Sequence, residues 1–258
     1  MAFPLQPESA PNMWQLMTNP DAYQPQNEEY RRISLFQKDY QRAQPYPSNN
    51  FTAGNQKFRE IKYVILNSTP GDDVRALASH RTTGNQCPHY LIGVEGDVAQ
   101  LVHEKDIAHT FRKPVHWGID ADINPYSLHI SLVHLDEGFT EAQYTALLAL
   151  LRNVCNRNNI LRCDVIGAFE VALSDQYGPA NGFNWRRLEA EGLAQPWSKR
   201  STRDPLRALA DHGYPVRNKP DNSSQVVRAF QRRYVPRRVT GRVCKRTRQK
   251  ILHADYRK

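Results

Sequence analysis

Cysteine, long apolar runs and N-terminal positive charge are scarce in this sequence, and each shortage excludes a class of protein. The four cysteines, Cys87, Cys155, Cys163 and Cys244, form no CxxC pair and no zinc-ribbon spacing, so we expect reduced packing residues rather than a disulfide frame. No apolar run reaches the ~18 residues that a membrane-spanning helix needs. Residues 1–30 contain no Lys or Arg and no apolar stretch, so we expect neither a secretory signal nor a transit peptide.

Acidic residues are almost absent from the last segment, and this absence sets the charge of the whole chain. The formal net charge of the 258 residues is +9. Residues 226–258 hold twelve Lys and Arg against the single acid Asp255, whereas residues 1–225 carry a slight acidic excess. Such a block favours an anionic partner, namely RNA or other nucleic acid, anionic lipid, or an acidic protein surface. The candidate partner-binding residues are Arg228, Arg232, Arg233, Arg237, Arg238, Arg242, Lys245, Arg246 and Arg248.

The pattern along the chain predicts three parts. Residues 1–57 are rich in Pro, Gln, Asn and Tyr, and we interpret them as an extended arm with a short helix near residues 27–40. In residues 58–197 predicted strands alternate with helices, which indicates an α/β domain with a mixed central sheet flanked by helices. Residues 198–258 are interpreted as a polar linker and a small basic domain of three helices.

Several local signals support the α/β prediction. Residues 89–102 have the pattern of a hairpin that turns at Glu95, Gly96 and Asp97. Thr140 followed by Gln143 predicts a capping box, with a helix beginning at that point. Further strands are predicted at 61–66, 127–135 and 163–169, and a further helix at 182–193.

The last segment also predicts an amphipathic helix. Val226, Val227, Phe230 and Tyr234 fall on one face, so we expect the arginines between them to point outward. The alternative is that the aromatic residues are core and the basic residues form an ordinary solvated face.

Four strings occur in an order that resembles a known family. They are "IKYVILNST" at 61–69, "CPHYLIGVEGDVAQLVHEKDIAHT" at 87–110, "SLHISL" at 127–132 and "VIGAFEVALSDQYGPANGFNW" at 165–185. Together they resemble the type-2, zinc-dependent N-acetylmuramoyl-L-alanine amidases, which are related to peptidoglycan-recognition proteins. Residues 204–258, with "VVRAFQRRYV" and "GRVCKRT", resemble the small peptidoglycan-binding domain attached to some of these amidases.

The resemblance implies a zinc site that this sequence has lost. In the family, two His and one Asp hold the zinc, a Glu acts as base and a Lys stabilises the oxyanion. The zinc-ligand positions correspond here to Asn67, Ala168 and Gly178, and the Glu and Lys positions correspond to Ser131 and Gln176. We therefore expect no zinc and no catalytic residues.

Other polar residues are weaker candidates for a site. Six side chains are possible substitute zinc ligands, although a pocket without an ion is favoured over them: Glu170, Asp175, His80, His116, His129 and His134. Four residues are possible lining of the family's substrate groove: His89, His109, His116 and Trp117. For these four, a structural role in the core is the alternative.

From these patterns we expect a catalytically inactive amidase-like pseudoenzyme that serves as a structural or interaction subunit. Its arm would contact protein subunits of a larger assembly, and its basic domain a polyanion or an acidic surface. A ribonucleoprotein, an organellar complex and a virion remain open as assemblies, and so does the compartment. The alternatives are an active peptidoglycan amidase with an unorthodox site and a non-hydrolytic peptidoglycan-binding protein.

Overall fold

The computed structural model describes residues 44–45, 47–53, 59–82, 84–119, 121–136, 138–197, 202–216 and 222–252. The helix predicted near residues 27–40 and most of the predicted arm lie outside this part of the chain. The division of the chain at residues 57 and 197 stays a prediction.

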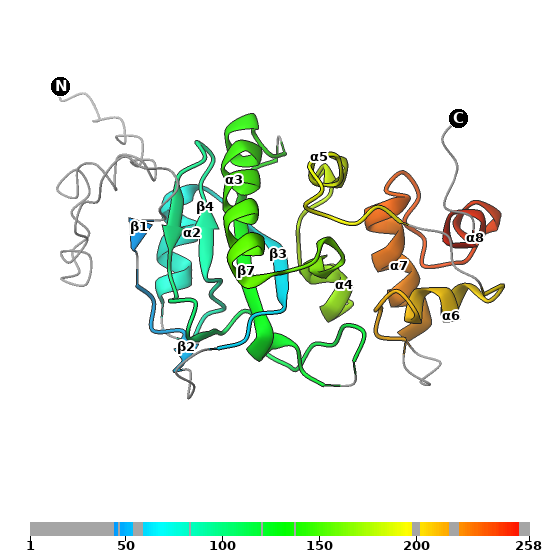
Figure 1. Ribbon diagram of the computed structural model, residues 1–258. Coiled ribbons are helices and arrows are strands. Elements are labelled where there is room, and N and C mark those ends of the chain that lie inside the picture. Colours follow the sequence, from blue (N-terminus) through cyan, green and yellow to red (C-terminus); the bar gives the residue numbers. More distant parts are fainter. Residues whose placement is uncertain are drawn as a thin grey trace, which may run out of the picture.

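Six strands form one mixed sheet in the order β1-β5-β4-β7-β3-β8 (Figure 1). Neighbouring strands run parallel except for β4 and β5, which form an antiparallel hairpin. β2 and β6 pair separately in an antiparallel ladder. The bounds are β1 Gln44–Pro45, β2 Phe51–Thr52, β3 Tyr63–Pro70, β4 Tyr90–Ile92, β5 Val98–Gln100, β6 Ile107–Ala108, β7 Ser127–His134 and β8 Val165–Gly167.

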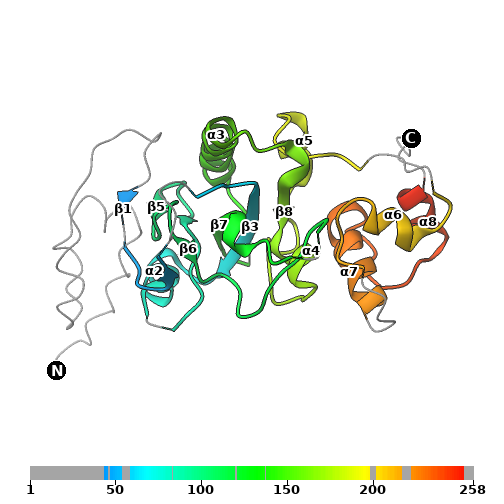
Figure 2. The ribbon, with the colours of Figure 1, turned by 60° about the horizontal axis from the view of Figure 1, so that its bottom comes forward.

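Helices cover both faces of this sheet, which confirms the predicted fold class. Figure 2 shows α3 and α5 on one side of the strands and α2 and α4 on the other. Because both faces are covered, β7 at the centre is buried along nearly its whole length, including the polar Ser127, His129 and Ser131. The bounds are α2 Asp73–Arg81, α3 Glu141–Asn158, α4 Ala168–Ala172 and α5 Trp185–Ala190.

The two strongest local predictions are confirmed. The hairpin of β4 and β5 turns at residues 95–97, with Gly96 at a positive φ of 85°. Helix α3 begins after Thr140, whose hydroxyl accepts a hydrogen bond from the Gln143 amide, while the Gln143 side chain accepts one from the Thr140 amide. Both features depend on residues close together in sequence, so neighbouring side chains suffice to specify them.

Several predicted element boundaries are wrong: β3 spans residues 63–70 rather than 61–66, and α5 spans 185–190 rather than 182–193. The strand predicted at 163–169 ends at Gly167, because the carboxylate of Glu170 accepts a hydrogen bond from the Gly167 amide and starts helix α4 there. The residue that caps α2 is Asp72, whose carboxylate accepts a hydrogen bond from the Arg75 amide. Asp73 is buried and accepts from the Val94 amide instead.

Three short helices follow at one end of the molecule (Figure 1). They are α6 Pro205–Ala210, α7 Ser223–Tyr234 and α8 Lys245–Leu252. Trp197 lies among them: its indole packs edge-on against Phe230 and donates a hydrogen bond to the carbonyl of Ile251. Among the described residues, every helix is too short or too polar to span a bilayer.

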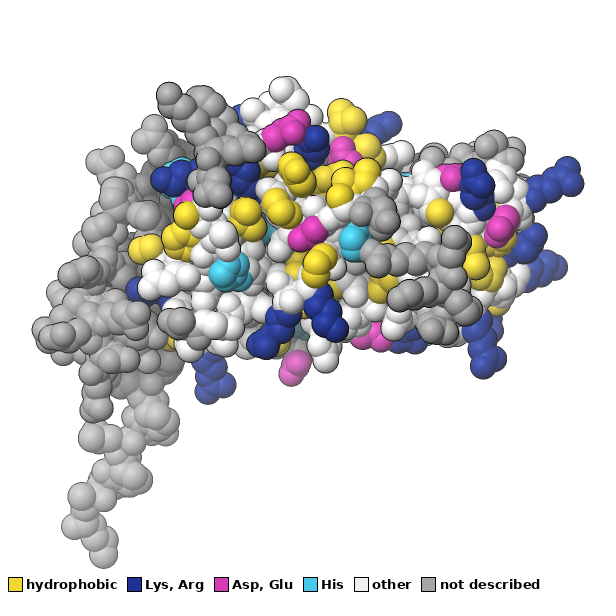
Figure 3. All heavy atoms as spheres, turned by 90° about the horizontal axis from the view of Figure 1, so that it is seen from below, with side chains coloured by type: hydrophobic (Ala, Val, Ile, Leu, Met, Phe, Trp, Pro, Cys, Tyr) yellow, Lys and Arg dark blue, Asp and Glu magenta, His cyan; other side chains and the backbone are white. Residues whose placement is uncertain are grey.

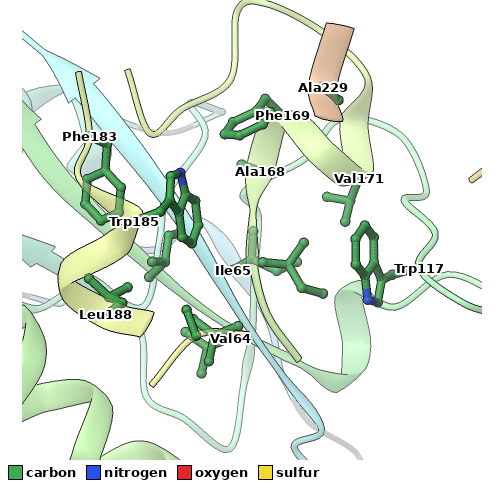
Figure 4. Packing of buried hydrophobic residues seen from close by; sticks show 14 of the residues in the cluster. Val64, Ile65, Trp117, Ala168, Phe169, Val171, Phe183, Trp185, Leu188 and Ala229 are labelled. Atoms are coloured by element: carbon green, nitrogen blue, oxygen red, sulfur yellow. The ribbon is translucent and has the colours of Figure 1, made fainter. Parts of the chain in front are cut away.

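The main core is continuous between the sheet and these helices. Ile65 and Ala168 lie in its interior between Trp185 on one side and Trp117 on the other (Figure 4). Trp117 extends this core toward the C-terminal helices, because its ring packs against Tyr214. The close approach of the chain at this point requires Gly213, because a Cβ there would overlap the Trp117 ring.

A buried ion pair joins α7 to α4. The side chains of Glu170 and Arg233 are 0% and 3% exposed, and Arg233 Nη1 donates to Glu170 Oε2 over 2.8 Å. The Tyr214 hydroxyl donates to the other carboxylate oxygen, at 2.5 Å. The Arg233 guanidinium also stacks on Trp185, 4.0 Å from the ring centroid. Removing one member of such a pair leaves the other charge buried without a partner, which lowers the free energy of unfolding.

We expect Arg233→Met to lower the free energy of unfolding by about 3–5 kcal/mol, because it leaves the Glu170 carboxylate buried without its cation. The double variant with Glu170→Gln should lose less than the sum of the two single changes. Urea unfolding measures both. The matched control is the exposed Arg237→Met, for which we expect a change within about 0.5 kcal/mol. Equal losses for Arg233→Met and Arg237→Met would contradict this role of the pair.

Candidate functional site

The carboxyl ends of the central strands bring three of the predicted positions together. Asn67 on β3 is in register with Ser131 on β7, so their side chains lie on the same face of the sheet. On the other side of β3, Leu66 pairs with Gly167, which places Ala168 directly after the end of β8. In open α/β sheets this edge is where ligands usually bind.

A fourth predicted position, Gly178, completes the cluster. Its amide donates a hydrogen bond to Asn67 Oδ1 over 2.6 Å, and its carbonyl accepts one from the Phe169 amide. A Cβ at Gly178 would overlap the backbone nitrogen and the hydroxyl of Ser68 and come within 3.0 Å of Asn67 Oδ1. The Asn67 side chain is thus already bonded to the loop, and this backbone position has no room for a larger residue.

Side chains that carry hydroxyl groups lie next to this cluster on the sheet. Ser131 Oγ lies 2.8 Å from Thr69 Oγ1, which lies 2.8 Å from His80 Nε2. His80 Nδ1 is 2.7 Å from the carbonyl of Gln86, and the Gln86 side chain donates to the Tyr177 hydroxyl. Burial lowers the pKa of His80, although its hydrogen bond to Gln86 opposes the shift. Ser131, Thr69 and His80 thus form one chain of side-chain hydrogen bonds, which ends at the backbone carbonyl of Gln86.

The remaining predicted positions carry no catalytic group into the cluster. Ala168 is fully buried in the hydrophobic core, and Gln176 lies exposed on the loop before Gly178. An amide, a methyl group and a hydrogen therefore stand at the three predicted ligand positions, and none of these is a usual zinc donor. The residues present do not fit a zinc ion.

The six possible substitute ligands are dispersed or engaged elsewhere. Within the described part of the chain, no group of three or more His, Cys, Asp or Glu side chains is placed to hold a metal. Glu170 is bonded to Arg233 and Tyr214, and Asp175 forms an ion pair with Arg228 at 2.7 Å. His80 is held by Thr69 and Gln86, as described above. His134 packs against Phe139, and His116 Nδ1 lies 3.1 Å from the carbonyl of Ala121.

His129 and His89 are buried side by side beneath the site. Their rings stack with centroids 5.5 Å apart, and Phe111 lies edge-on to His129. Burial lowers the pKa of His89 to about 3, and the positive charge of Arg59 adds to the effect. Burial also lowers the pKa of His129 strongly, and neither of its ring nitrogens has a hydrogen-bond partner among the described residues. Both imidazoles are therefore neutral.

The four possible groove residues have separate roles. His89 is completely buried and cannot line an open groove; its Nδ1 accepts a hydrogen bond from the His129 amide. Trp117 is buried in the core, so the core alternative holds for it too. His109 is exposed and lies 2.9 Å from Thr52 Oγ1. His116 is partly exposed.

The sequence patterns did not indicate Arg59 as a residue of the site. Its side chain nevertheless makes more hydrogen bonds than most others near the site. Its guanidinium donates to the carbonyls of Pro125, Glu104, Asp106 and Ser127 at 2.5–2.9 Å. These contacts join the segment before β3 to the loops around β6 and β7. Nothing in the local sequence signals this, because a lone Arg beside a predicted strand is typical of an exposed residue.

A pocket of about 440 Å³ lies beside the cluster, between the sheet edge and α7. One wall comes from the ends of β3 and β7, at Ser68, Pro70 and His134, and another from the loop at residues 175–181. Arg228 and Arg232 of α7 form the opposite wall. The C-terminal helices therefore contribute directly to the surroundings of the site.

The prediction that the arginines of α7 point outward is wrong for Arg233 and Arg232. Arg233 is buried against Glu170. Arg232 is 9% exposed, stacks on Phe169 and donates to the carbonyls of Tyr177 and Pro179. The sequence does contain a signal for the burial of Arg233. This residue stands three positions after Phe230 and seven after Val226, which places it on the apolar face of the helix. Anion binding by the other basic residues stays a prediction.

Comparison with known proteins places this architecture. The crystal structure of AmpDH3 from Pseudomonas aeruginosa aligns with a TM-score of 0.65 and 21% sequence identity, over 79% of this chain and 94% of that chain. The complex of the N-acetylmuramyl-L-alanine amidase AmiD from E. coli with anhydro-N-acetylmuramic acid-L-Ala-D-gamma-Glu-L-Lys aligns with a TM-score of 0.63 and 21% identity, over 79% and 96%. A comparison with curated proteins finds no match.

The fold is thus that of an α/β amidase domain followed by a small helical module. Residues 57–180 also match the family described as N-acetylmuramoyl-L-alanine amidase. This match covers most of the α/β part of the chain, which therefore contains a domain of the N-acetylmuramoyl-L-alanine amidase type.

The neutral histidines predict acid sensitivity. An unfolded His takes up a proton near pH 6.5, whereas the lowered pKa values of His80, His89 and His129 keep the folded rings neutral. Their contribution to stability is therefore complete above about pH 6.5 and is lost as the pH falls below it. His129→Leu should reduce the acid slope of the unfolding free energy by up to about 1.4 kcal/mol per pH unit.

Urea unfolding between about pH 7 and pH 4 measures this slope. His129→Leu breaks no side-chain hydrogen bond, so its effect at neutral pH should be small. The control is the exposed, non-titrating Asn156→Ala, which should leave the slope unchanged. An unaltered slope in His129→Leu would show that this ring is protonated in the folded protein.

Proposed function

We propose that this protein is a catalytically inactive member of the amidase family that serves as a structural or interaction subunit of a larger assembly. The observation that carries the proposal is the bond from the Gly178 amide to Asn67 Oδ1. In this arrangement two positions that the family uses for zinc contact each other directly. The overlap that a Cβ at Gly178 would meet supports the same reading.

The chemistry of the neighbouring residues supports it further. Hydrolysis of an amide needs an activated water and stabilisation of the developing oxyanion. Ser131 is bonded to Thr69 and is not a general base at neutral pH. Gln176 carries no positive charge to stabilise an oxyanion.

The interaction role rests on how the C-terminal helices are held. Buried contacts of Arg232 and Arg233 fix α7 to the α/β domain, so the helical module forms a rigid extension of it. The basic residues that take no part in these contacts remain available to a partner. A fixed scaffold with an unpaired charged surface suits a docking subunit.

A second candidate is non-hydrolytic binding of peptidoglycan fragments, in the manner of a receptor. The pocket of about 440 Å³ beside Ser68 and Gly178 favours it, and AmiD was solved with a muramyl peptide bound. Calorimetric titration with anhydro-muramyl tripeptide separates the candidates. Saturable binding would support the receptor, and its absence would support the docking subunit.

We expect the purified protein to hold no stoichiometric zinc, because Asn67, Ala168 and Gly178 supply neither imidazole nor carboxylate. Elemental analysis after dialysis against zinc-containing and zinc-free buffers measures the content. An active amidase of the family, treated in the same way, is the positive control. One zinc per chain that survives dialysis would refute the loss of the site.

We expect no release of peptide from muropeptides, even with added zinc, since nothing in the cluster activates water. Asn67→His should be equally inactive, because one restored ligand does not create a three-ligand site and Gly178 leaves no room for a carboxylate. Chromatography of the digested muropeptides detects the products. Turnover by the unaltered protein, abolished by a chelator, would instead support an amidase with an unorthodox site.

A further inference from the structure

Six basic side chains of the C-terminal module form what we term the exposed basic surface. Each is exposed to solvent, and none belongs to the buried contacts of α7. Residues 222–252 contain no Asp or Glu at all, so no acid of the same segment neutralises them. Figure 3 shows several Lys and Arg side chains projecting from this end of the molecule. The six are Arg237, Arg238, Arg242, Lys245, Arg246 and Arg248.

The structure separates these residues from the arginines that hold the module. Arg228, Arg232 and Arg233 face the α/β domain, where they pair with Asp175 and Glu170. Acids of the domain therefore neutralise the inner charges, and the outer charges are left to solvent. This division could not be read from the continuous run of basic residues in the sequence.

The loop and the helix contribute to one surface around the start of α8. Thr247, Ile251 and Leu252 are the buried residues of α8, so Lys245, Arg246 and Arg248 lie on its outer side. Arg238 of the preceding loop is close to Cys244, whose pKa is lowered first by its hydrogen bond to Thr247 and additionally by this arginine. The positive end of the α8 dipole adds to the same local potential.

We propose that the exposed basic surface binds the phosphate backbone of double-stranded nucleic acid. This deepens the proposed function, because it names the partner of the interaction subunit. An Arg fork matches a phosphate with two hydrogen bonds, and several such groups without acids between them suit a regularly charged polymer. Contacts of this kind read no base sequence.

The surroundings of the surface disfavour other partners. Single strands are usually held by exposed aromatic rings, but Phe230 and Tyr234 pack against Trp197. A surface that binds a membrane or another protein needs exposed apolar side chains at its centre. The only large apolar side chain exposed on the described part of the module is Val243, at 38%.

Binding of a fluorescent duplex of about 20 base pairs, as DNA and as RNA, tests the proposal with the full-length protein. If about five phosphates are contacted, log affinity should fall with log salt at a slope of about −4 to −5. Replacing Arg238, Arg242, Lys245 and Arg246 by Gln should weaken binding by on the order of ten-fold or more and flatten the slope.

The matched control removes the same charge elsewhere, at four exposed basic residues of the α/β domain: Lys105, Arg112, Lys113 and Arg186, each changed to Gln. It should bind the duplex nearly as tightly as the unaltered protein. Alkylation of Cys244, followed by mass spectrometry, gives an independent readout, because a bound duplex should slow it while leaving that of Cys163 unchanged.

Equal weakening in both four-residue variants would overturn the proposal, since binding would then follow net charge alone. Tighter binding to anionic vesicles or to a poly-glutamate peptide than to the duplex, at the same salt concentration, would also overturn the proposal. Neither result bears on zinc content or muropeptide hydrolysis, so failure here is distinguishable from failure of the proposed inactivity.

Discussion

The carboxylate of Glu170 joins three parts of this molecule in one buried interaction. It accepts the Gly167 amide and so starts α4 at the end of β8, and it binds both Tyr214 and Arg233 of the C-terminal module. A fully buried carboxylate must be paired and hydrogen-bonded to be tolerated. The position of the module and the path of the chain through Ala168 therefore depend on the same group.

This dependence explains why the cluster at Asn67, Ala168 and Gly178 and the C-terminal helices form one unit. Arg233 holds α4, which begins with Ala168, and its neighbour Arg232 holds the carbonyls of Tyr177 and Pro179, on either side of Gly178. The segments that hold Ala168 and Gly178 are thus attached to α7. Two arginines and the bond from Gly178 to Asn67 connect them in this chain.

The sequence predicted those features that nearby residues or family strings specify. The hairpin at 89–102, the cap at Thr140 and the α/β fold belong to this group, and the strand register brings Asn67 and Ser131 together as the family strings imply. The partners of Arg233 and His80 were not predicted, because their contacts join residues that only the folded sheet brings together. The predicted outward direction of the α7 arginines is wrong for Arg232 and Arg233, because carbonyls and a carboxylate of the α/β domain bind them in the interior.

We propose that contacts within the chain have replaced the metal at the end of β3. Crystals grown with zinc and measured on both sides of the zinc absorption edge test this claim most directly. We expect no anomalous peak between Asn67, Ala168 and Gly178, and a Gly178 amide still bonded to Asn67 Oδ1. A peak about 2.0–2.2 Å from a protein nitrogen or oxygen at that position would contradict it.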